Sequence, residues 1–419
     1  MTQPEKPGNS TALVIGGGII GLACANGLQR RGIATTLFDP SSPVRSASWG
    51  NAGHIAVEQV EPLAAPGALA SLPRRLFCRG GAASFPLRDI GAWLPFGWRL
   101  LRASGPRGFA AGKLALSSLL SAALPAWRRL TSSTGSERFL VEDGHYIVWE
   151  SERGARAGRA HWRNADIGVA KLHDLTRQEA GLIASLISRA PADGMRFVGT
   201  ARVRDPGLLH EALSRAFVAS GGLIRNEGIR ELQVTGSRAS ALTSLREALT
   251  ADHIVMSAGV GSAGLLRPLG YEVPIIAERG YHLQSAASEW PDIAPVVFEE
   301  RSMIVSRFET GLRAASFVEF SRESSPPDPR KWQRLRSHVA ALRLPMTSPP
   351  SEWMGVRPTL PDYLPALGRS TRADNLIFAF GHQHLGLTLA AVTGEIVSSL
   401  VLNEAATVDL APFALERFG

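Results

Sequence analysis

Three glycines near the start of the chain have the spacing of a diphosphate-binding turn. Gly16, Gly18 and Gly21 form the pattern G-x-G-x-x-G directly after a short apolar run at residues 11–15. In such a pattern the first glycine permits a tight strand-to-helix turn, and the second lets a diphosphate approach the backbone. The third lets the helix pack closely on the strand. The amides and the dipole at the helix N-terminus then favour the negative charge of the diphosphate.

An acidic residue follows at the distance expected of a ribose-binding carboxylate. Asp39 lies 23 residues after Gly16, at the end of a second apolar run at residues 33–38. At that position its carboxylate accepts hydrogen bonds from ribose hydroxyls. The order strand, glycines, helix, strand, acid is far more specific than the glycines alone. It predicts a dinucleotide site that includes Gly16, Gly18, Ile19, Ile20, Gly21, Asp39 and Pro40.

The composition describes a globular chain with more than one domain. Its 419 residues are enough for two to three domains, and 45% of them are hydrophobic. It has only two cysteines, Cys24 and Cys78, so we expect neither a structural disulfide nor a zinc cluster of cysteines. This cysteine usage fits a reducing compartment, and the sequence predicts a cytoplasmic protein.

Charge and hydropathy limit the partners that the chain is expected to have. Residues 1–10 contain no apolar signal core, and the uncharged stretch at residues 114–127 is shorter than the roughly 20 residues that span a bilayer. The formal net charge is +8, and residues 69–107 alternate arginines with leucines and tryptophans. Those residues form either an amphipathic surface that touches the inner face of a membrane or connecting helices with solvated arginines. No nucleic-acid-binding module is recognisable.

The remaining pattern predicts how the elements are arranged. We expect a hairpin at residues 139–149, helices at 206–219 and 328–343, and a strand, loop and helix over 376–402. Pieces of a mononucleotide-binding fold occur at the start of the chain, near residues 200–265 and at the end. The region between them has a more antiparallel pattern.

This segregation predicts an α/β fold of two interleaved, discontinuous domains. One is a Rossmann-like dinucleotide-binding domain of residues 10–65, 195–270 and 353–419. The other is a substrate domain built on an antiparallel sheet, from residues 66–194 and 271–352.

Six stretches of the chain resemble the D-amino-acid oxidase-like family of FAD enzymes, which includes glycine oxidase and the bacterial D-amino-acid dehydrogenases. They are the glycine motif and residues 46–54, 201–229, 255–261, 353–362 and 375–388. The resemblance implies that the dinucleotide is FAD, bound by a Rossmann-like domain of the glutathione-reductase type. The antiparallel sheet is then expected to cover the flavin.

The resemblance also implies which further residues contact FAD. They are Ser48, Asn51, Ala52, Gly53, His54, Ile229, Ser257, Ala258, Gly259, Gly381, His382, Gln383, Leu385, Gly386, Leu387 and Thr388. Within this set we expect His382 and Gln383 to be polar groups that face the flavin without abstracting a proton. The flavin is expected to be noncovalent, because Gly50 stands where relatives with a covalent flavin carry a histidine, and no cysteine follows Cys78.

The candidate catalytic residues are Arg357, Tyr281 and His384. Arg357 lies in a G-x-R-P sequence that is similar to the family's carboxylate-binding signature, and a guanidinium can grip a carboxylate with two hydrogen bonds. Tyr281 is either a second carboxylate partner or lid residue, or a half-buried strand tyrosine. His384 is expected on the substrate side, where it can bind a polar substituent. Arg301 and Arg307 are alternative anion-binding residues.

The resemblance implies the oxidative deamination of a D-amino acid. Hydride passes from the substrate Cα to flavin N5, and the imine product hydrolyses to a 2-oxo acid. The sequence of residues 381–386 is similar to that of members acting on hydroxy-D-proline, and the expected electron acceptor is a quinone. The alternatives are an oxygen-using oxidase of glycine or sarcosine type, an FAD subunit of a multi-protein dehydrogenase, and a flavin-binding protein without amine chemistry.

Overall fold

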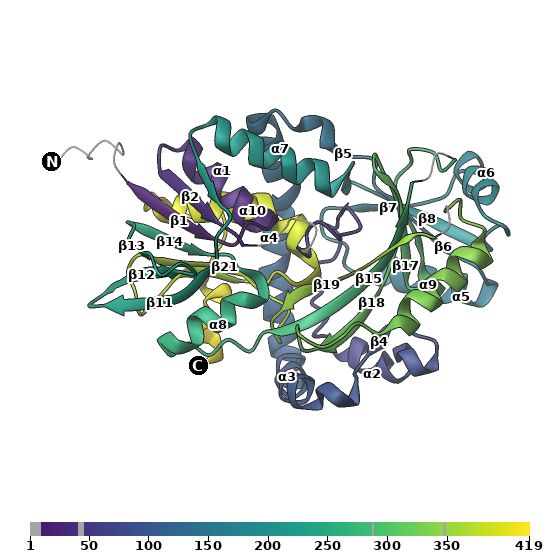
Figure 1. Cartoon of the computed structure of the whole chain (residues 1–419). Coiled ribbons are helices and arrows are strands. Elements are labelled where there is room, and N and C mark those ends of the chain that lie inside the picture. The colour runs from purple at the N-terminus through teal and green to yellow at the C-terminus, as the bar shows by residue number, and fades with distance from the viewer. Residues whose placement is uncertain (1–9, 41–45, 287–288, 347–348) are drawn as a thin grey trace.

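The computed structural model describes residues 10–40, 46–286, 289–346 and 349–419. Two large sheets of different kinds occupy the two halves of the molecule (Figure 1). The α/β class expected from the sequence is confirmed, with one mostly parallel sheet and one mostly antiparallel sheet.

The first sheet has six strands and is parallel except at one edge, where β20 and β21 are antiparallel. Its order is β10 (Leu223–Arg225), β2 (Ala34–Phe38), β1 (Thr11–Ile15), β14 (His253–Met256), β21 (Leu376–Phe380) and β20 (Ala366–Arg369). The central strands β1, β14 and β21 are short apolar runs that are buried on both faces, as parallel strands generally are, whereas the edge strand β10 is largely exposed. Strand β1 lies next to the centre, so the glycine turn that follows it opens at the middle of the sheet edge.

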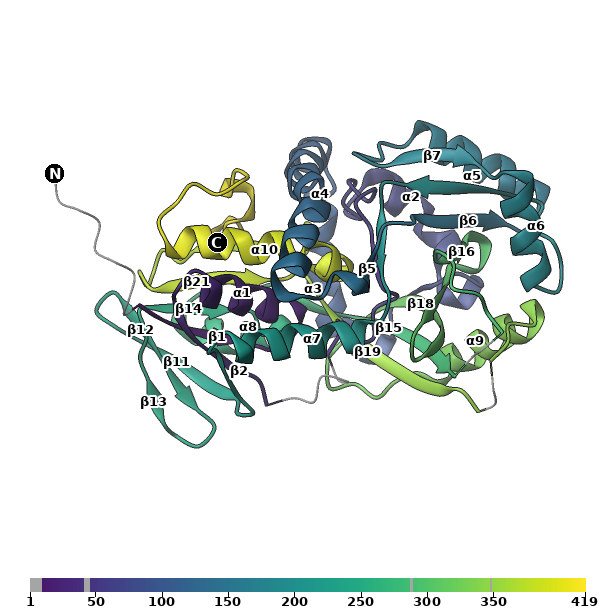
Figure 2. The same ribbon diagram turned by 90° about the horizontal axis from the view of Figure 1, so that it is seen from above.

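Helices cover one face of this sheet, and a small hairpin sheet covers the other (Figure 2). Ala12 and Val14 of β1 pack in the cluster formed by the helices, whereas Leu13 and Ile15 pack towards the hairpin sheet. The helices are α1 (Ile19–Arg30), α4 (Pro106–Thr134), α7 (Pro206–Ala219) and α10 (Gly386–Val401). The hairpin sheet is formed by β11 (Ile229–Thr235), β12 (Arg238–Thr243) and β13 (Ala248–Leu249), with α8 (Ser262–Leu266) beside it.

The second large sheet has nine strands, and most neighbours are antiparallel. Its order is β19 (Ser351–Thr359), β15 (Ile276–Ser285), β18 (Gly311–Ser321), β17 (Met303–Phe308), β16 (Val296–Phe298), β6 (His145–Trp149), β8 (Asp193–Val198) and β7 (Lys171–Asp174), with β4 (Ala83–Ser84) paired to β18. The helices that pack around it are α2 (Pro66–Arg75), α3 (Ile90–Ala103), α5 (Glu152–Asn164), α6 (Arg177–Leu186) and α9 (Pro329–Leu342).

The predicted hairpin at residues 139–149 is wrong. Strand β5 (Leu140–Val141) pairs with β9 (Ala201–Val203), and β9 also pairs with β3 (His54–Ile55). Strand β6 instead pairs with β8 and β16 in the nine-stranded sheet. The Glu-Asp-Gly turn between β5 and β6 therefore carries the chain from the small sheet to the large one.

The proposed division into domains stays a prediction. The six-stranded sheet takes its strands from residues 11–38, 223–256 and 366–380, all inside the segments assigned to the dinucleotide-binding domain. Strands β8 and β19, which the proposed boundaries at residues 195 and 353 divide, both belong to the nine-stranded sheet.

Among the described residues, two helices are long and apolar enough to cross a membrane, although no such segment was expected from the sequence. One runs over Gln383–Val401, and 72% of its most apolar window is buried inside the molecule. The other is α4, and 44% of its most apolar window is buried inside the molecule. Leu116, Leu120 and Trp127 of α4 pack in the same core as α1 and α10, so both helices contribute to the interior.

Candidate active site

The turn between β1 and α1 requires glycine at two of the three motif positions. Gly16 has a φ of +104°, and a Cβ there would lie 2.5 Å from the carbonyl oxygen of Ser257. A Cβ on Gly21 would lie only 1.8 Å from the carbonyl oxygen of Gly16. These two glycines therefore let α1 start directly against the sheet.

Gly18, the second glycine of the motif, leaves open space at the start of α1. The nearest atom to a Cβ on Gly18 would be the Ser48 hydroxyl oxygen, at 3.7 Å. Gly18 is the N-cap of α1 and provides no side-chain cap, and the first turn of the helix contains no acidic residue. The Ile19 amide donates to the Ser48 hydroxyl at 3.2 Å, and the helix dipole faces a space that favours an anion. Asp39 Oδ2 accepts the Gly17 amide at 2.5 Å, which places the carboxylate beside the same turn.

A cavity of about 920 Å³ lies in front of this turn and extends to the nine-stranded sheet. Its volume is near the upper end of the roughly 300–1,000 Å³ that small-molecule and cofactor sites have. Among the predicted site residues its wall includes Gly16, Gly18, Ile19, Ile20, Asp39, Pro40, Ser48, Asn51, Ala52, His54, Ile229, Ser257, Ala258, Gly259, Tyr281, Arg357, Gly381, His382, Gln383, His384, Gly386 and Leu387. Thus residues from 16 to 387 in the chain meet at one space.

Four residues predicted to contact FAD are not in this wall, and their contact with FAD stays a prediction. They are Gly21, Gly53, Leu385 and Thr388. Gly21 faces the backbone of Gly16, and a Cβ on Gly53 would meet the ring of Phe308 at 2.6 Å. The Thr388 hydroxyl accepts the Ala56 amide at 2.9 Å. These residues support the wall from behind.

The loop at residues 46–54 is held by groups that the sequence analysis missed. The Arg313 guanidinium donates to the carbonyl oxygens of Trp49, at 2.8 Å, and Asn51, at 2.5 Å. The Ser306 hydroxyl donates to the carbonyl oxygen of Ala52 at 2.7 Å. Arg313 is buried, and burial lowers its pKa to about 9. A cation from β18 therefore fixes the backbone that borders the cavity.

Trp353 fills the space beside Gly50. A Cβ on Gly50 would lie 2.0 Å from the Trp353 ring, and the same ring stacks on His282 at 4.8 Å between centroids. A histidine at position 50 has no room against this indole. The geometry supports the expectation that the flavin is not attached at this position.

A second helix N-terminus faces the other end of the cavity. Strand β21 ends at a turn in which Gly381 has a φ of +81° and Gln383 a φ of +46°. A short 3₁₀ helix at Gln383–Leu385 then leads into α10, whose first turn has neither an acidic residue nor a side-chain cap. Gly386 and Leu387 at its start both border the cavity. This end of α10 favours negative charge on a bound group.

His382 and Gln383 border the cavity, but their polar side-chain atoms do not act as expected. His382 Nε2 lies 3.0 Å from the Thr393 hydroxyl, within α10. The Gln383 amide donates to the carbonyl oxygen of Tyr363 and accepts from the amide of His384, both at 3.0 Å. Both side chains hold the turn together, so it is the backbone of this turn that faces a ligand.

Arg357 presents a partly free guanidinium to the cavity. Its Nη1 donates to Glu278 Oε1 and to the carbonyl oxygen of Phe317, both at 3.2 Å. Glu278 is buried and also accepts from the hydroxyls of Thr359 and Tyr363. Within the described part of the chain, Nη2 and Nε have no such partner, and the side chain is 27% exposed. One edge of the guanidinium is therefore fixed, and the other is free to bind a carboxylate.

A strained residue supplies one of the Arg357 contacts. Phe317 has a φ of +72° and lies at a bulge, where Ser316 pairs with Tyr281 but Glu319 pairs with Arg279. Such a backbone costs about 1–3 kcal/mol and persists only where the surroundings impose it. Here it directs the Phe317 carbonyl oxygen to the guanidinium. Sequence reasoning missed both Phe317 and Glu278, because neither belongs to a motif.

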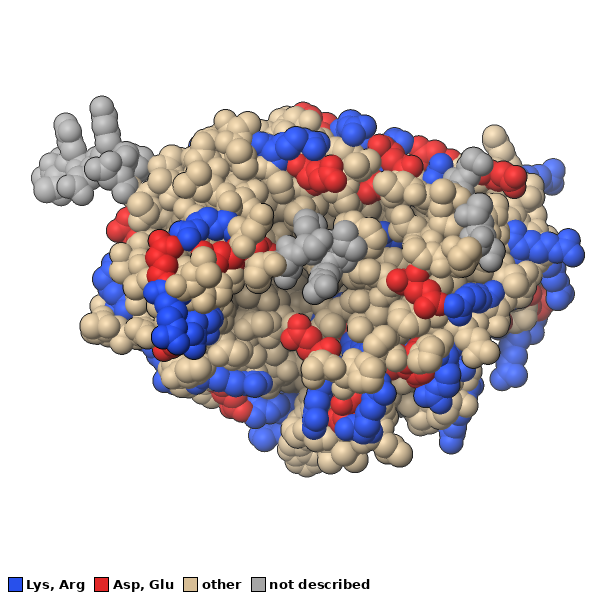
Figure 3. Space-filling view, in the orientation of Figure 1, with Lys and Arg blue, Asp and Glu red and all other residues tan. Residues whose placement is uncertain are grey.

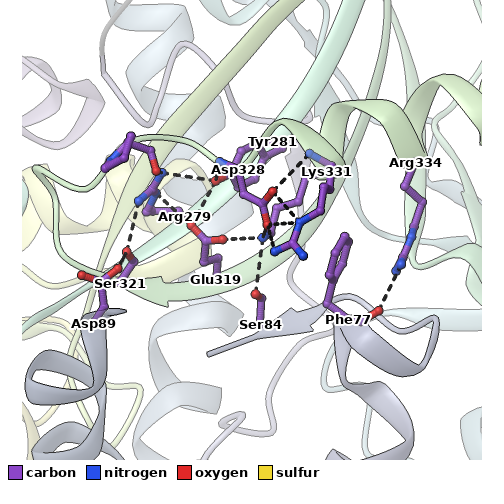
Figure 4. Close-up of polar contacts among 12 residues, drawn as sticks. Phe77, Ser84, Asp89, Arg279, Tyr281, Glu319, Ser321, Asp328, Lys331 and Arg334 are labelled. Carbon is purple, nitrogen blue, oxygen red and sulfur yellow. Dashed lines mark hydrogen bonds and ion pairs between the residues drawn. The ribbon is translucent and has the colours of Figure 1, made fainter. Parts of the chain in front are cut away.

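The Tyr281 hydroxyl is bonded to protein groups, so a contact with a substrate carboxylate stays a prediction without support from this geometry. Its backbone borders the cavity, but the hydroxyl donates to Glu319 Oε1 at 3.0 Å and accepts from Arg279 and from the Asp328 amide, both at 3.2 Å. Figure 4 shows these groups together with Lys331 of α9, whose ammonium pairs with Glu319. The side chain is buried in strand β15, deeper than the half-buried alternative, and burial raises the pKa of its hydroxyl.

His384 borders the same cavity as Arg357, and its position on the substrate side stays a prediction. Its Nε2 lies 2.7 Å from the Gln59 side-chain oxygen, which makes Nε2 the protonated nitrogen and Nδ1 the acceptor. Nδ1 is buried without a hydrogen-bond partner among the described residues. Burial, with a smaller effect of Arg357, lowers the pKa of His384 to about 3, so the ring is neutral. The sequence analysis did not identify Gln59.

The alternative anion binders are occupied by other groups. Arg301 pairs with Glu150 at 2.7 Å, and Arg307 donates to the carbonyl oxygen of Phe308 at 2.6 Å. Neither residue is part of the cavity wall. Arg357 is therefore the best-placed anion-binding side chain among those that the sequence suggested.

The wall as a whole fits FAD. One helix N-terminus and an open glycine suit a diphosphate beside Asp39, and Ile229 and Ser257 border the neighbouring part of the cavity. The N-terminus of α10 suits a ring system whose edge becomes negative on reduction. Arg357 and His384 lie beyond that helix, where a substrate would meet the ring.

Comparison with known proteins gives the same assignment. The model of the family DAO, described as FAD dependent oxidoreductase, matches residues 11–400. The chain is 29% identical to a D-amino-acid oxidase from Bradyrhizobium diazoefficiens, over 97% of this chain and 98% of that protein. It is also 29% identical to D-amino acid dehydrogenase 2 from Ralstonia nicotianae, over 96% and 99% of the two chains. Glycine oxidase from Geobacillus kaustophilus has the same fold, with a TM-score of 0.70 at 21% identity over 97% and 99% of the two chains.

Proposed function

The chain belongs to the DAO family of FAD-dependent oxidoreductases, and we propose that it oxidises a D-amino acid, with Arg357 as the carboxylate-binding residue. The observation that carries the proposal is the half-free guanidinium of Arg357. It lies in the wall of a cavity whose other end is the glycine turn. Relatives named D-amino-acid oxidase and D-amino acid dehydrogenase, each aligned over almost their whole length, support the substrate class.

The residues of this chain orient the substrate and complete the site. FAD, when bound, supplies a ring that takes up two electrons as a hydride. Nη2 and Nε of Arg357 hold the carboxylate, which fixes the direction of the Cα–H bond. The buried pair with Glu278 keeps the guanidinium from rotating. The imine product then leaves the cavity and hydrolyses in water.

A cyclic substrate, D-proline or hydroxy-D-proline, is the narrower proposal. Its support is His384 Nδ1, a buried acceptor without a partner among the described residues, in a neutral ring that Gln59 holds in one tautomer. A substrate hydroxyl can donate to this nitrogen. Such a contact discriminates strongly against an analogue without the hydroxyl, because the polar atom of the site is then left unpaired.

For the electron acceptor we propose a quinone in a membrane that the protein touches from the cytoplasmic side. The support is one face of α3 and the turn before it, where Leu87, Ile90, Leu94, Trp98 and Leu101 are each at least 45% exposed. The opposite face of α3 packs through Phe96 on Ile276 and Phe320. Exposed arginines border the apolar face, including Arg88 and Arg102. Figure 3 shows basic side chains gathered along the edge of the molecule that carries α2 and α3.

The experiment that tests the proposal is the anaerobic bleaching of the flavin absorption band by candidate substrates. We expect hydroxy-D-proline to bleach the band fastest and D-proline more slowly, with the L-isomers, glycine and sarcosine far slower than both. Air is then admitted. A slow return of the band without stoichiometric hydrogen peroxide supports a quinone acceptor, and a prompt return with peroxide supports the oxidase alternative. Bleaching by sarcosine or glycine alone would contradict the D-amino-acid proposal.

A further inference from the structure

A cluster of three potential metal-binding side chains lies at the cavity wall, which His54 borders. His54 is in β3, Glu58 is in the turn that follows, and His145 is the first residue of β6. One ligand atom from each lies within 4.8 Å of the other two. Glu58 and His145 are 3% and 2% exposed. The three residues come from segments that the small sheet β3-β9-β5 brings beside the nine-stranded sheet.

The cluster contains polar atoms that nothing in the described chain satisfies. His54 Nε2 and Glu58 Oε2 are buried without a hydrogen-bond partner. The two residues approach each other only to 3.7 Å, which is too far for a hydrogen bond. Among the described residues Glu58 forms no ion pair with a lysine or arginine. A buried carboxylate and a buried imidazole left this way cost free energy unless a further group binds them.

The third candidate ligand, His145, is oriented by residues outside the cluster. His145 Nδ1 lies 3.3 Å from the hydroxyl of Thr200, which is fully buried. The ring also stacks on Phe197, at 4.5 Å between centroids and an angle of 7°. The hydrogen bond at Nδ1 leaves Nε2 as the available nitrogen. Metal-binding histidines are typically oriented by such a hydrogen bond on their other nitrogen.

We infer that His54, Glu58 and His145 bind one divalent transition-metal ion, with Zn²⁺ as the best match. Two imidazole nitrogens and one carboxylate oxygen are a common ligand set for Zn²⁺, and its bonds of about 2.0–2.2 Å require the three side chains to move slightly inward. Water completes the coordination. The dication supplies the positive charge that the buried Glu58 carboxylate lacks.

Such an ion would fix part of the cavity wall. It joins the turn after β3 to β6. Glu58 and His145, its ligands in these two segments, are 87 positions apart in the chain. The same turn carries Ala56 and Gln59, both of which border the cavity, and Gln59 holds His384. The site therefore positions residues on the substrate side without touching a substrate. The inference does not depend on which amino acid the enzyme oxidises.

The test is the zinc content of the flavin-loaded protein, measured by inductively coupled plasma mass spectrometry. The protein is stripped with a chelator, loaded with Zn²⁺ and dialysed. We expect about one zinc per chain, and X-ray absorption is expected to show nitrogen and oxygen ligands at about 2.0–2.2 Å. Glu58→Gln and His145→Ala are expected to lose the ion. Thr200→Val keeps all three ligands and is expected to weaken zinc binding about tenfold.

The exposed His161 provides the matched control, because His161→Ala removes an imidazole that is not one of the three ligands. It should keep the full zinc content. Circular dichroism confirms that each variant is folded, and Thr200→Val keeps the test decisive if a ligand variant fails to fold. Wild-type protein without stoichiometric zinc after loading would overturn the inference, as would equal zinc binding by the wild type, Glu58→Gln and Thr200→Val.

Discussion

Arg357 is the side chain on which the proposed reaction depends most. Its Nη1 is held by Glu278 and Phe317. The side chain therefore loses little conformational entropy when its free edge binds a carboxylate. Truncating one partner of a buried charge pair costs about 2–5 kcal/mol. We therefore expect Arg357→Ala to lower kcat/KM by roughly 30- to 5,000-fold while the protein keeps FAD.

Steady-state kinetics with an artificial electron acceptor measures this change, and the flavin spectrum measures cofactor content. Arg156→Ala, in an exposed arginine of α5, is the control and should leave both unchanged. Arg357→Lys is expected to recover only a small part of the rate, because an ammonium cannot form the paired hydrogen bonds. Wild-type kinetics in Arg357→Ala would remove Arg357 from the site.

His382 makes the stability of the fold sensitive to acid. Burial lowers its pKa from 6.5 to about 3, so the imidazole is neutral in the folded chain. The unfolded chain takes up a proton near pH 6.5, so between pH 6.5 and 3 the unfolded state binds more protons than the folded state. Stability from this group is therefore complete above pH 6.5 and is lost as the pH falls, by about 1.4 kcal/mol per pH unit.

Urea unfolding between pH 7 and 5 measures this dependence. We expect the free energy of unfolding of the wild type to fall by about 2 kcal/mol from His382 alone. His384, whose pKa is also lowered to about 3, adds to the fall. His382→Asn should show a shallower dependence on pH, whereas the exposed His161→Asn should match the wild type. Identical pH profiles for wild type and His382→Asn would show that this histidine is protonated in the folded protein.

Two glycines in the turn between β1 and α1 have different roles. Gly21 is needed for the fold, whereas Gly18 leaves room for a ligand. A Cβ on Gly21 overlaps the Gly16 carbonyl oxygen at 1.8 Å, whereas a Cβ on Gly18 meets only Ser48, at 3.7 Å. We expect Gly21→Ala to destabilise the FAD-free protein by about 1–3 kcal/mol and to prevent FAD binding. Gly18→Ala should leave the melting temperature of the FAD-free protein unchanged and weaken FAD binding.

Thermal unfolding with and without FAD distinguishes the two variants. Gly236→Ala, at a hairpin turn with no atom within 4 Å of the added Cβ, is a control for the substitution itself. Its left-handed φ of +62° makes it strained, so it reports the cost of backbone strain without overlap. An equal loss of stability in Gly18→Ala and Gly21→Ala would contradict the division of roles.

Elements that local sequence determines could be predicted, and those that distant contacts determine could not. The strand, glycine turn and helix at residues 11–30 follow from an apolar run and three glycines, and α7 begins at Pro206 as expected. Strand β5 was misassigned because its partner β9 lies about 60 residues away. The role of Tyr281 stayed open because the sequence Arg-Gly-Tyr-His does not show which side chains face the cavity. The bulge at Phe317 and the charged groups of α9 decide that.

The candidate site shows the same division between motif and tertiary contact. Residues of the glycine motif and of the loop at 46–54 were found because close backbone approach leaves small residues in a fixed order. Glu278, Gln59 and Arg313 were missed because each acts through one long-range contact, with Arg357, His384 and the Asn51 carbonyl oxygen respectively. A lone polar residue in a strand or turn carries no signal in one sequence.

At the scale of the whole molecule, exposed arginines lie beside an exposed apolar helix face. The net charge is +8, and the apolar face of α3 lies among exposed arginines such as Arg88, Arg102 and Arg107. An amphipathic helix of this kind binds anionic bilayers through buried apolar area and electrostatic attraction together. We therefore expect the protein to sediment with vesicles that contain an anionic lipid, less at high salt, and hardly at all with neutral vesicles.

The substitutions Leu94→Glu and Trp98→Glu test this surface directly. These side chains are 56% and 65% exposed, so the fold does not depend on them, whereas burying each in a membrane is worth about 1.5–3 kcal/mol. Each substitution should lower vesicle binding by at least about tenfold and slow quinone reduction in membranes. It should leave the reduction of a soluble dye unchanged. Leu245→Glu, in a 78% exposed leucine between β12 and β13, is the control. If the wild type and Leu94→Glu bind vesicles equally, α3 is not a membrane surface, and electrons must leave the flavin for a soluble acceptor.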